Sequence, residues 1–298
     1  MQPLTLHAFG ELAAHIFAAR PPAQATNDVL ELGRIEMTVG GGSTLVCQQV
    51  AALGHRVRLD AMVGHDSLGS WLLAELHDLG IECPEPLRNG ARSTRTLVLH
   101  ASSGSHAIVH EPSDADRSRF TVAARAVTGC RFAYAPGFPG FEPVLEAMSA
   151  AGVETVVDLG YRPWLVDPDT YRTEVLRRAQ FATVGLLSAD GLDDSQRERL
   201  MVDVAAAGSR VVVATLGPRG AWVLADGGPI RHVSAVACKP VNTLGAGDAF
   251  AAGFIVGLAE GLDPVAATGL ACATAAAVIT MFPSLPNRAD VDAMRSLE

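Results

Sequence analysis

The chain is almost without lysine, and this absence excludes one common way of holding phosphate. Of 23 basic residues in 298, Lys239 is the only lysine. It lies outside any G-x-x-x-x-G-K-[ST] sequence, so the chain has no P-loop. The basic residues form no dense run and the formal net charge is −9, which disfavours binding to nucleic acid because like charges repel. Any phosphate site in this protein must therefore be built without the usual lysine.

Paired cysteines and long apolar runs are missing as well. The five cysteines are widely spaced and form no C-x-x-C pair, which disfavours a disulfide framework or a zinc site and indicates reduced thiols. The N-terminal stretch carries Glu11 and His15 and no basic region, so we expect no signal peptide. No uninterrupted apolar run reaches the roughly 18 residues of a membrane helix. We therefore expect a cytoplasmic protein that binds no membrane.

What the chain does contain is enough apolar material for a large core, arranged in an alternating order. Apolar residues make up 49% of the sequence, which excludes a disordered chain. Short β-branched runs alternate with helical segments, and this order predicts one α/β domain over residues 1–298, with a doubly wound, mostly parallel sheet. Strands are expected at 4–9, 57–63, 154–158, 183–187 and 210–215, and helices at 44–53, 68–79, 143–151, 175–179, 195–207, 246–260 and 265–280.

Two stretches interrupt this alternation, at about residues 13–39 and 92–111. Both contain extended, partly alternating segments with Pro-Pro or Ser-Ser-Gly-Ser punctuation. The second stretch reads as a hairpin with its turn at 102–105. We expect these strands to lie outside the main sheet and to form a small β lid over one edge.

The most specific motif is Val-Asn-Thr-Leu-Gly-Ala-Gly-Asp-Ala-Phe, residues 241–250. Gly245, Ala246 and Gly247 open a helix, so their backbone N–H groups form an anion site at the helix N-terminus. Asp248, in the first turn, is placed to accept a proton from an attacking hydroxyl. The alternative is that Asp248 only caps the helix. A dinucleotide G-x-G-x-x-G motif is excluded because Phe250 occupies the third glycine position.

Five segments together resemble the PfkB (ribokinase-like) family of sugar and nucleoside kinases. Thr-Leu-Gly-Ala-Gly-Asp-Ala-Phe-Ala-Ala-Gly-Phe, residues 243–254, is similar to the C-terminal signature of that family. Further similar segments are Gly-Gly-Gly-Ser at 40–43, Val-Gly-His-Asp-Ser-Leu-Gly at 63–69, Asp-Leu-Gly-Tyr-Arg-Pro at 158–163 and Thr-Leu-Gly-Pro-Arg-Gly-Ala at 215–221. They occur in the family's order across nearly the whole chain.

The resemblance implies a ribokinase-like fold and transfer of the γ-phosphoryl group of ATP to a hydroxyl of a small sugar-like substrate. Asp248 would be the base, and the Gly245, Ala246 and Gly247 amides would stabilise the transferring group, with Mg²⁺ bridging the phosphates. By the same resemblance, the nucleotide would lie near Thr215, Gly217, Gly220, Ser188 and Cys272. The substrate would lie near His15, Gly41, Gly42, Ser43, Arg162 and Asp248. The lid would be a possible homodimer contact.

Several positions depart from the family pattern. His15 stands where the family has an aspartate that holds sugar hydroxyls, and Leu45 stands where it has an asparagine. Because lost polar contacts are costly in a site that binds hydroxyls, we expect a substrate that is less hydroxylated or anionic. His15 has an alternative interpretation as a purely structural histidine. The apolar Leu45 is also compatible with a nucleoside substrate.

The nucleotide side departs too. Ser188-Ala189-Asp190-Gly191 replaces the family's Asn-x-x-Glu, which leaves Asp190 as a candidate metal ligand. Cys272 stands where an asparagine lies near the adenine, and Asn242 replaces an aspartate, which leaves a monovalent-cation site open. Three functions follow: a sugar kinase, a nucleoside kinase of the same fold, or a catalytically weakened binding or regulatory protein.

Overall fold

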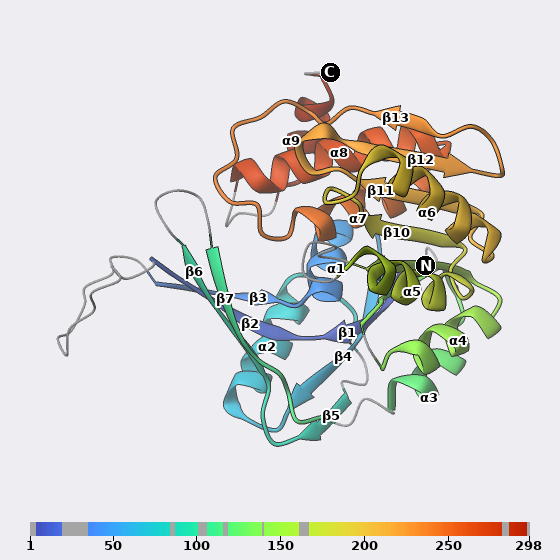
Figure 1. Cartoon of the computed structure of the whole chain (residues 1–298). Coiled ribbons are helices and arrows are strands. Elements are labelled where there is room, and N and C mark those ends of the chain that lie inside the picture. The colour runs from blue at the N-terminus through green and yellow to red at the C-terminus, as the bar shows by residue number, and fades with distance from the viewer. Residues whose placement is uncertain are drawn as a thin grey trace.

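The computed structural model describes residues 4–19, 35–83, 87–100, 106–115, 119–138, 140–160, 167–281 and 286–296. These ranges form one large sheet with helices on both faces and a separate small sheet that projects from one side (Figure 1). The helices and strands of the two sheets position every part of the candidate site. The predicted fold class is therefore confirmed.

The main sheet has the strand order β13-β12-β11-β10-β9-β8-β1-β4-β5. Its strands pair in parallel from β5 to β11, whereas β12 and β13 add an antiparallel edge. The strands are β1 (Leu4–Glu11), β4 (Val57–Gly64), β5 (Leu87–Gly90), β8 (Cys130–Pro136), β9 (Glu154–Gly160), β10 (Val184–Ser188), β11 (Val211–Thr215), β12 (Ala221–Ala225) and β13 (Arg231–Val233).

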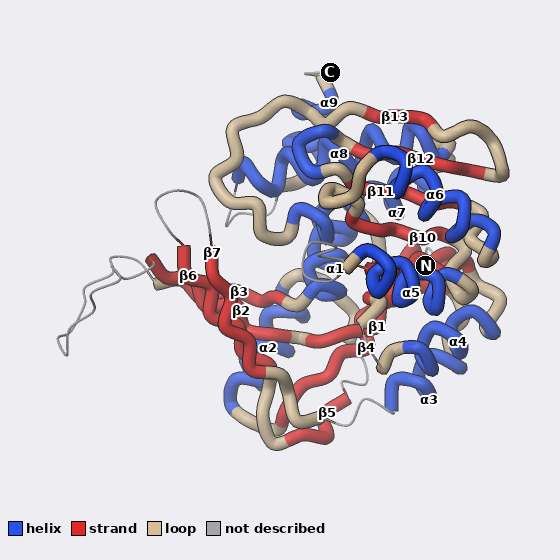
Figure 2. The backbone as a smooth tube through the Cα atoms, viewed as in Figure 1, coloured by secondary structure: helices blue, strands red, loops and turns tan. Residues whose placement is uncertain are grey.

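Each face of the main sheet is covered by its own helices, which makes two apolar cores (Figure 2). One core contains side chains of α1 (Gly42–Ala52), α2 (Ser67–Asp78), α7 (Ala246–Ala259), α8 (Pro264–Met281) and α9 (Arg288–Arg295). The other contains side chains of α3 (Arg119–Arg125), α4 (Glu142–Ala150), α5 (Pro168–Ala179) and α6 (Asp194–Ala206). Helices on both faces are what a parallel sheet requires, because its strands are apolar on both sides.

The small sheet has the order β3-β2-β6-β7 and contains β2 (Ala13–Ala19), β3 (Glu36–Gly40), β6 (Thr94–His100) and β7 (His106–Glu111). Its strands come from the two stretches predicted to lie outside the main sheet, and β2 follows β1 with only Leu12 between them. His15 on β2 lies opposite Thr38 on β3 and Thr96 on β6. The expected turn at 102–105 lies outside the described residues.

Some elements were not predicted from the sequence or have different bounds. The strands β5, β8, β12 and β13 and the helices α3 and α9 were missed, and α5 begins at Pro168 rather than at 175. Asp167 accepts a hydrogen bond from the amide of Thr170 and Pro168 follows it, so the helix begins with a polar turn before its first buried residue, Tyr171. Apolar periodicity alone therefore locates only the second half of this helix.

Helix α8 is long and apolar enough to cross a membrane by length and composition, although no uninterrupted apolar run was found in the sequence. Half of it is buried inside the protein, as in the core helix of a soluble protein. Its residues belong to the same core as α1 and α7. We therefore interpret α8 as a core helix.

Candidate active site

Two of the predicted site residues, Ser188 and Thr215, lie at the carboxyl ends of parallel strands. Because β1, β8, β9, β10 and β11 are parallel neighbours, their carboxyl ends lie along one edge of the sheet, where open α/β sheets bind ligands. Asp158 lies near the end of β9, Ser188 ends β10 and Thr215 ends β11. The N-termini of α1 and α7 complete the site.

The glycine segment at the start of α1 is held against the end of β1. Gly41 has a φ of +101°, and a Cβ there would lie 2.2 Å from the carbonyl oxygen of Glu11, so only glycine fits. The Ser43 hydroxyl donates to the carbonyl of Phe9 at 2.7 Å, and the Thr44 hydroxyl donates to that of Glu11 at 3.0 Å. Ser43 therefore anchors the helix, and Gly41 and Gly42 form its partly exposed tip.

His15 holds the same segment from the other side. The Gly41 amide donates to Nε2 of His15 at 3.2 Å, so this imidazole is neutral and carries its proton on Nδ1. Burial and the nearby His110 lower the pKa of His15 to about 4. A Cβ on Gly40 would lie 2.3 Å from the His15 ring. The structure therefore gives His15 a role in shaping the glycine segment, in agreement with the structural alternative.

The N-terminus of α7 has the shape of an anion site. Gly245 is the N-cap residue in a left-handed conformation with a φ of +78°, and no side chain caps this helix end. Asn242 shapes the preceding turn, because its side-chain oxygen accepts from the Leu244 amide at 2.9 Å. A Cβ on Gly247 would have no atom within 4 Å, so the first turn faces open space. The Ala246 amide donates to the Thr243 carbonyl at 3.3 Å, whereas the Gly245 and Gly247 amides form no hydrogen bond with the described residues and can reach an anion directly.

Asp248 does not cap its helix. Asp66, Asp167 and Asp193 each accept an amide of their helix, whereas the Asp248 carboxylate accepts no hydrogen bond from the described residues. It points toward α1, since a Cβ on Gly42 would lie 3.2 Å from Oδ1 of Asp248. The capping alternative is therefore not what the structure shows.

The electrostatic environment of Asp248 makes its carboxylate a strong base. Burial and the negative charge of Asp158 raise the pKa of Asp248 to about 8. Burial also raises the pKa of Asp158 to about 6, against the opposing effects of the Gly160 amide and Arg178. Strongly perturbed carboxyl groups in a cleft are typical of catalytic sites. Asp158 was not predicted as a site residue, although it opens the Asp-Leu-Gly-Tyr-Arg-Pro segment near the end of the buried strand β9.

The loops after β10 and β11 meet where the family resemblance predicts the nucleotide. Oδ1 of Asp190 lies 3.2 Å from the Arg219 guanidinium, and a Cβ on Gly217 would lie 3.4 Å from Oδ2 of Asp190. Gly217 and Gly220 have φ values of +57° and +91°, which require glycine and keep the loop tight. Asp190 thus lies against the compact turn that Gly217 and Gly220 form beside Thr215.

Two further predicted residues, Cys272 and Arg162, do not join this group in the described structure. Cys272 lies on α8 with 5% of its surface exposed, inside the apolar core. Arg162 lies outside the described residues.

Within the described ranges, no group of three or more His, Cys, Asp or Glu side chains could hold a metal ion. A Mg²⁺ ion here would therefore depend on oxygen atoms of a bound nucleotide together with one or two carboxylates, which is a common way for proteins to bind this ion.

Comparisons with known proteins agree with this geometry. Residues 5–283 match the family model described as pfkB family carbohydrate kinase. The chain is 30% identical over 278 residues to the bifunctional protein HldE of Azorhizobium caulinodans, covering 87% of this chain and 57% of that protein. The chain therefore spans little more than half the length of this relative.

Solved structures share the fold. The ribokinase of Thermotoga maritima superposes with a TM-score of 0.81 at 18% identity, covering 98% of this chain and 99% of that one. The ribokinase of Arabidopsis thaliana, complexed with ribose and ATP, superposes with a TM-score of 0.78 at 18% identity, over 100% of both chains.

Proposed function

Since the chain belongs to the pfkB family of carbohydrate kinases, we propose that it transfers the γ-phosphoryl group of ATP to a hydroxyl of a small sugar-like substrate. The observation that supports this proposal best is Asp248. Its carboxylate lies in the first turn of α7, next to the backbone amides of a helix end that no side chain caps, and against Gly42.

Each part of the site has a role in the proposed reaction. The ionised Asp248 carboxylate accepts the proton of the attacking hydroxyl, and its raised pKa makes it a stronger base than an ordinary aspartate. The amides of Gly245 and Gly247 donate to the phosphoryl oxygens as negative charge builds on them. The Ala246 amide, which donates to the Thr243 carbonyl at 3.3 Å, would have to leave this partner to join them. Gly41 and Gly42 allow the substrate to lie close to the backbone. His15 positions that segment.

The nucleotide would lie over Thr215, Gly217 and Gly220, next to Ser188. Mg²⁺ supplies charge neutralisation between the phosphates when it is bound, and Asp190 is the carboxylate on this side that would hold it. Cys272 and Arg162 stay predictions, as do a cytoplasmic location and a homodimer formed through the small sheet.

Substitution of Asp248 tests the proposal. Wild type, Asp248→Asn and Asp263→Asn are assayed for ATP consumption with Mg²⁺ and a panel of sugars and nucleosides. Asp263 is the matched control because it also lies at a helix start, where it accepts the Val265 and Ala266 amides. We expect Asp248→Asn to lower kcat by about 10³-fold or more, with ATP binding retained, and Asp263→Asn to match wild type. Unchanged turnover in Asp248→Asn would refute Asp248 as the base.

A catalytically weakened binding protein is the second candidate. It is favoured by the ion pair that engages Asp190 with Arg219 where the family has its Asn-x-x-Glu motif. Wild type that binds ATP and a sugar-like ligand but transfers no phosphate would establish this alternative.

A further inference from the structure

The motif Val-Gly-His-Asp-Ser-Leu-Gly at 63–69 has no role in the proposed reaction, but it contacts the chain that enters the small sheet. It spans the end of β4, the turn after it and the start of α2. Residues 91–93, which connect β5 in the main sheet to β6 in the small sheet, lie against this turn. A Cβ on Gly64 would lie 2.3 Å from the carbonyl carbon of Arg92, and a Cβ on Gly69 would lie 2.8 Å from Oγ of Ser93. Neither glycine has a positive φ, so it is this close approach that requires them.

Asp66 joins the turn to the connection through both of its carboxylate oxygens. Oδ1 accepts from the Gly69 amide at 2.8 Å and from the Ser93 hydroxyl at 2.6 Å. Oδ2 accepts from the Ser93 amide at 3.1 Å and from the Arg95 guanidinium at 3.2 Å. Burial acts to raise the pKa of Asp66, but these hydrogen bonds and the charge of Arg95 outweigh it and lower the pKa. Only the bond from Gly69 caps α2, so Asp66 does more than begin its helix.

Ser93 lies at the centre of this contact and is 1% exposed. Its hydroxyl accepts from the Gly64 amide at 3.1 Å while it donates to Asp66. Next to it, the Arg92 amide donates to Oδ1 of Asp114 at 2.9 Å, so the chain that leaves the small sheet after β7 is tied to the chain that enters it. We call Gly64, Asp66 and Ser93 the clasp.

The clasp holds β6 at the end where the small sheet begins. Thr94, the residue after Ser93, lies opposite Ala13, the first residue of β2. His15 lies two residues further along β2 and accepts the Gly41 amide at the start of α1. A shift of β6 at the clasp would therefore move the part of the small sheet that holds the glycine segment, where the substrate is proposed to lie.

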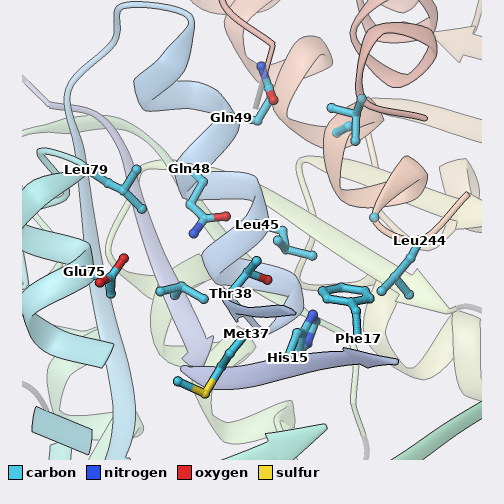
Figure 3. A pocket seen from close by; sticks show the side chains of 14 residues that line it. His15, Phe17, Met37, Thr38, Leu45, Gln48, Gln49, Glu75, Leu79 and Leu244 are labelled. Carbon is cyan, nitrogen blue, oxygen red and sulfur yellow. The ribbon is translucent and has the colours of Figure 1, made fainter. Parts of the chain in front are cut away.

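The small sheet also forms one wall of a pocket of about 320 Å³ (Figure 3). His15, Phe17 and Met37 of the small sheet lie opposite Leu45 and Gln48 of α1 across this pocket (Figure 3). The loop that leads into α7 lines it as well. The position of the small sheet relative to α1 therefore sets the width of the space beside the proposed anion site.

We propose that Asp66 is a positioning residue of this protein, which fixes the small sheet relative to α1 through Ser93 and so sets the width of that space. Asp66 acts through other residues, since it is not among the described residues that line the pocket. Its effect on the phosphoryl acceptor rests on the proposed kinase function, whereas its effect on the small sheet does not.

Asp66→Asn separates the clasp from the helix cap. Asparagine is itself a favoured N-cap, and its oxygen can still accept from the Gly69 amide and the Ser93 hydroxyl. Its NH₂ group, however, would face two donors, the Ser93 amide and Arg95. Asp167→Asn is the matched control, because Asp167 accepts only the amide and hydroxyl of Thr170, in its own helix. Ser93→Ala removes the other half of the clasp and leaves Asp66 in place.

Amide hydrogen exchange of the ligand-free proteins tests the position of the small sheet without any substrate. A hydrogen bond to a charged group is strong enough to shift a local opening equilibrium about 10-fold. We therefore expect Asp66→Asn and Ser93→Ala each to raise the exchange rates of β6 and β7 by about 10-fold, with α2 near wild type. The double variant should add little to the larger single effect. Asp167→Asn should change only the start of α5. Unchanged exchange in β6 and β7 would overturn the proposal.

Kinetics test the consequence for the site. The same variants are assayed with ATP, Mg²⁺ and the panel of sugars and nucleosides. We expect Asp66→Asn to raise the KM of the acceptor by about 10-fold and the KM of ATP by less than about twofold, because only the acceptor side is displaced. An unchanged KM of the acceptor, or an equal rise in both KM values, would refute the positioning role.

The failures of the two proposals are distinguishable. If wild type phosphorylates no member of the panel, the proposed function fails, and the exchange rates of β6 and β7 still decide whether Asp66 fixes the small sheet. If wild type is active and Asp66→Asn behaves like Asp167→Asn in both measurements, Asp66 is only a helix cap and the kinase function stands.

Discussion

Asp248 should make the folded protein less stable as the pH rises, and its replacement should remove that effect. The pKa of the carboxyl is about 8 in the folded chain, against an ordinary value of 3.8. Above pH 3.8 the unfolded chain releases this proton while the folded chain still binds it. The folded state is therefore penalised progressively between pH 3.8 and about 8, and stability from this group is fully present only below that window.

The size of this penalty follows from the raised pKa. At about 1.36 kcal/mol per pKa unit, the shift from 3.8 to about 8 corresponds to roughly 5 kcal/mol at pH 8, and to less than about 1 kcal/mol at pH 4. Asp248→Asn has the same shape and no titration. The free energy of unfolding of the variant should therefore exceed that of wild type by several kcal/mol at pH 8, and the two should converge at pH 4.

Urea unfolding of the ligand-free proteins, followed by tryptophan fluorescence at pH 4 to 9, measures this difference. Comparing two proteins at each pH cancels the contributions of the titrating groups that do not interact with Asp248; Asp158, which does, contributes to the difference. Asp263→Asn, at an exposed helix start, should follow wild type without such a pH-dependent gain. If Asp248→Asn and wild type run parallel across the pH range, the raised pKa and the reasoning built on it are wrong.

Three further outcomes are expected. The kcat/KM of wild type should rise with pH to a plateau, with the midpoint of the rise near pH 8. Asp158→Asn should move this midpoint to lower pH by roughly one unit, because a negative charge beside Asp248 is lost. An unchanged midpoint would show that Asp158 does not affect the pKa of Asp248. Gly41→Ala should lower the free energy of unfolding by about 3 kcal/mol. Gly54 has a φ of +90° but a Cβ there would have no atom within 4 Å, so Gly54→Ala should cost only its backbone strain of about 1 kcal/mol. Equal losses would show that the contact with the Glu11 carbonyl does not matter. The pKa of His15 is about 4 in the folded chain against 6.5 ordinarily, so the free energy of unfolding of wild type should fall by about 3 kcal/mol from pH 6.5 to pH 4. The fall should be smaller in His15→Gln, and identical acid unfolding of the two proteins would contradict this.

Much of the fold could be predicted because its local signals are strong. The Val-rich strands β9 to β11 and the capped helices α2 and α6 carry clear periodicity and helix-start residues. By contrast, β8 was missed, because Cys130–Pro136 combines small, aromatic and charged residues and becomes a strand through its pairing with β1 and β9. Pairing between distant segments is not visible in local sequence.

The candidate site was predictable where backbone geometry imposes the residue type. Gly41 and Gly245 need positive φ values, so the glycines mark the turns that form the site. The role of His15 could not be read from its identity, since it depends on the Gly41 amide across the small sheet.

The anion site that we propose at the N-terminus of α7 would consist of main-chain N–H groups, which has a consequence for regulation and for experiment. Such groups do not titrate, and no acetyl, carbamyl or glycating reagent can modify them. With Lys239 as the only lysine, amine-directed reagents find no target among the phosphate-binding groups proposed here. The pH dependence of turnover in this protein should therefore report on its carboxylates and the bound nucleotide, without a contribution from the groups that hold the phosphate.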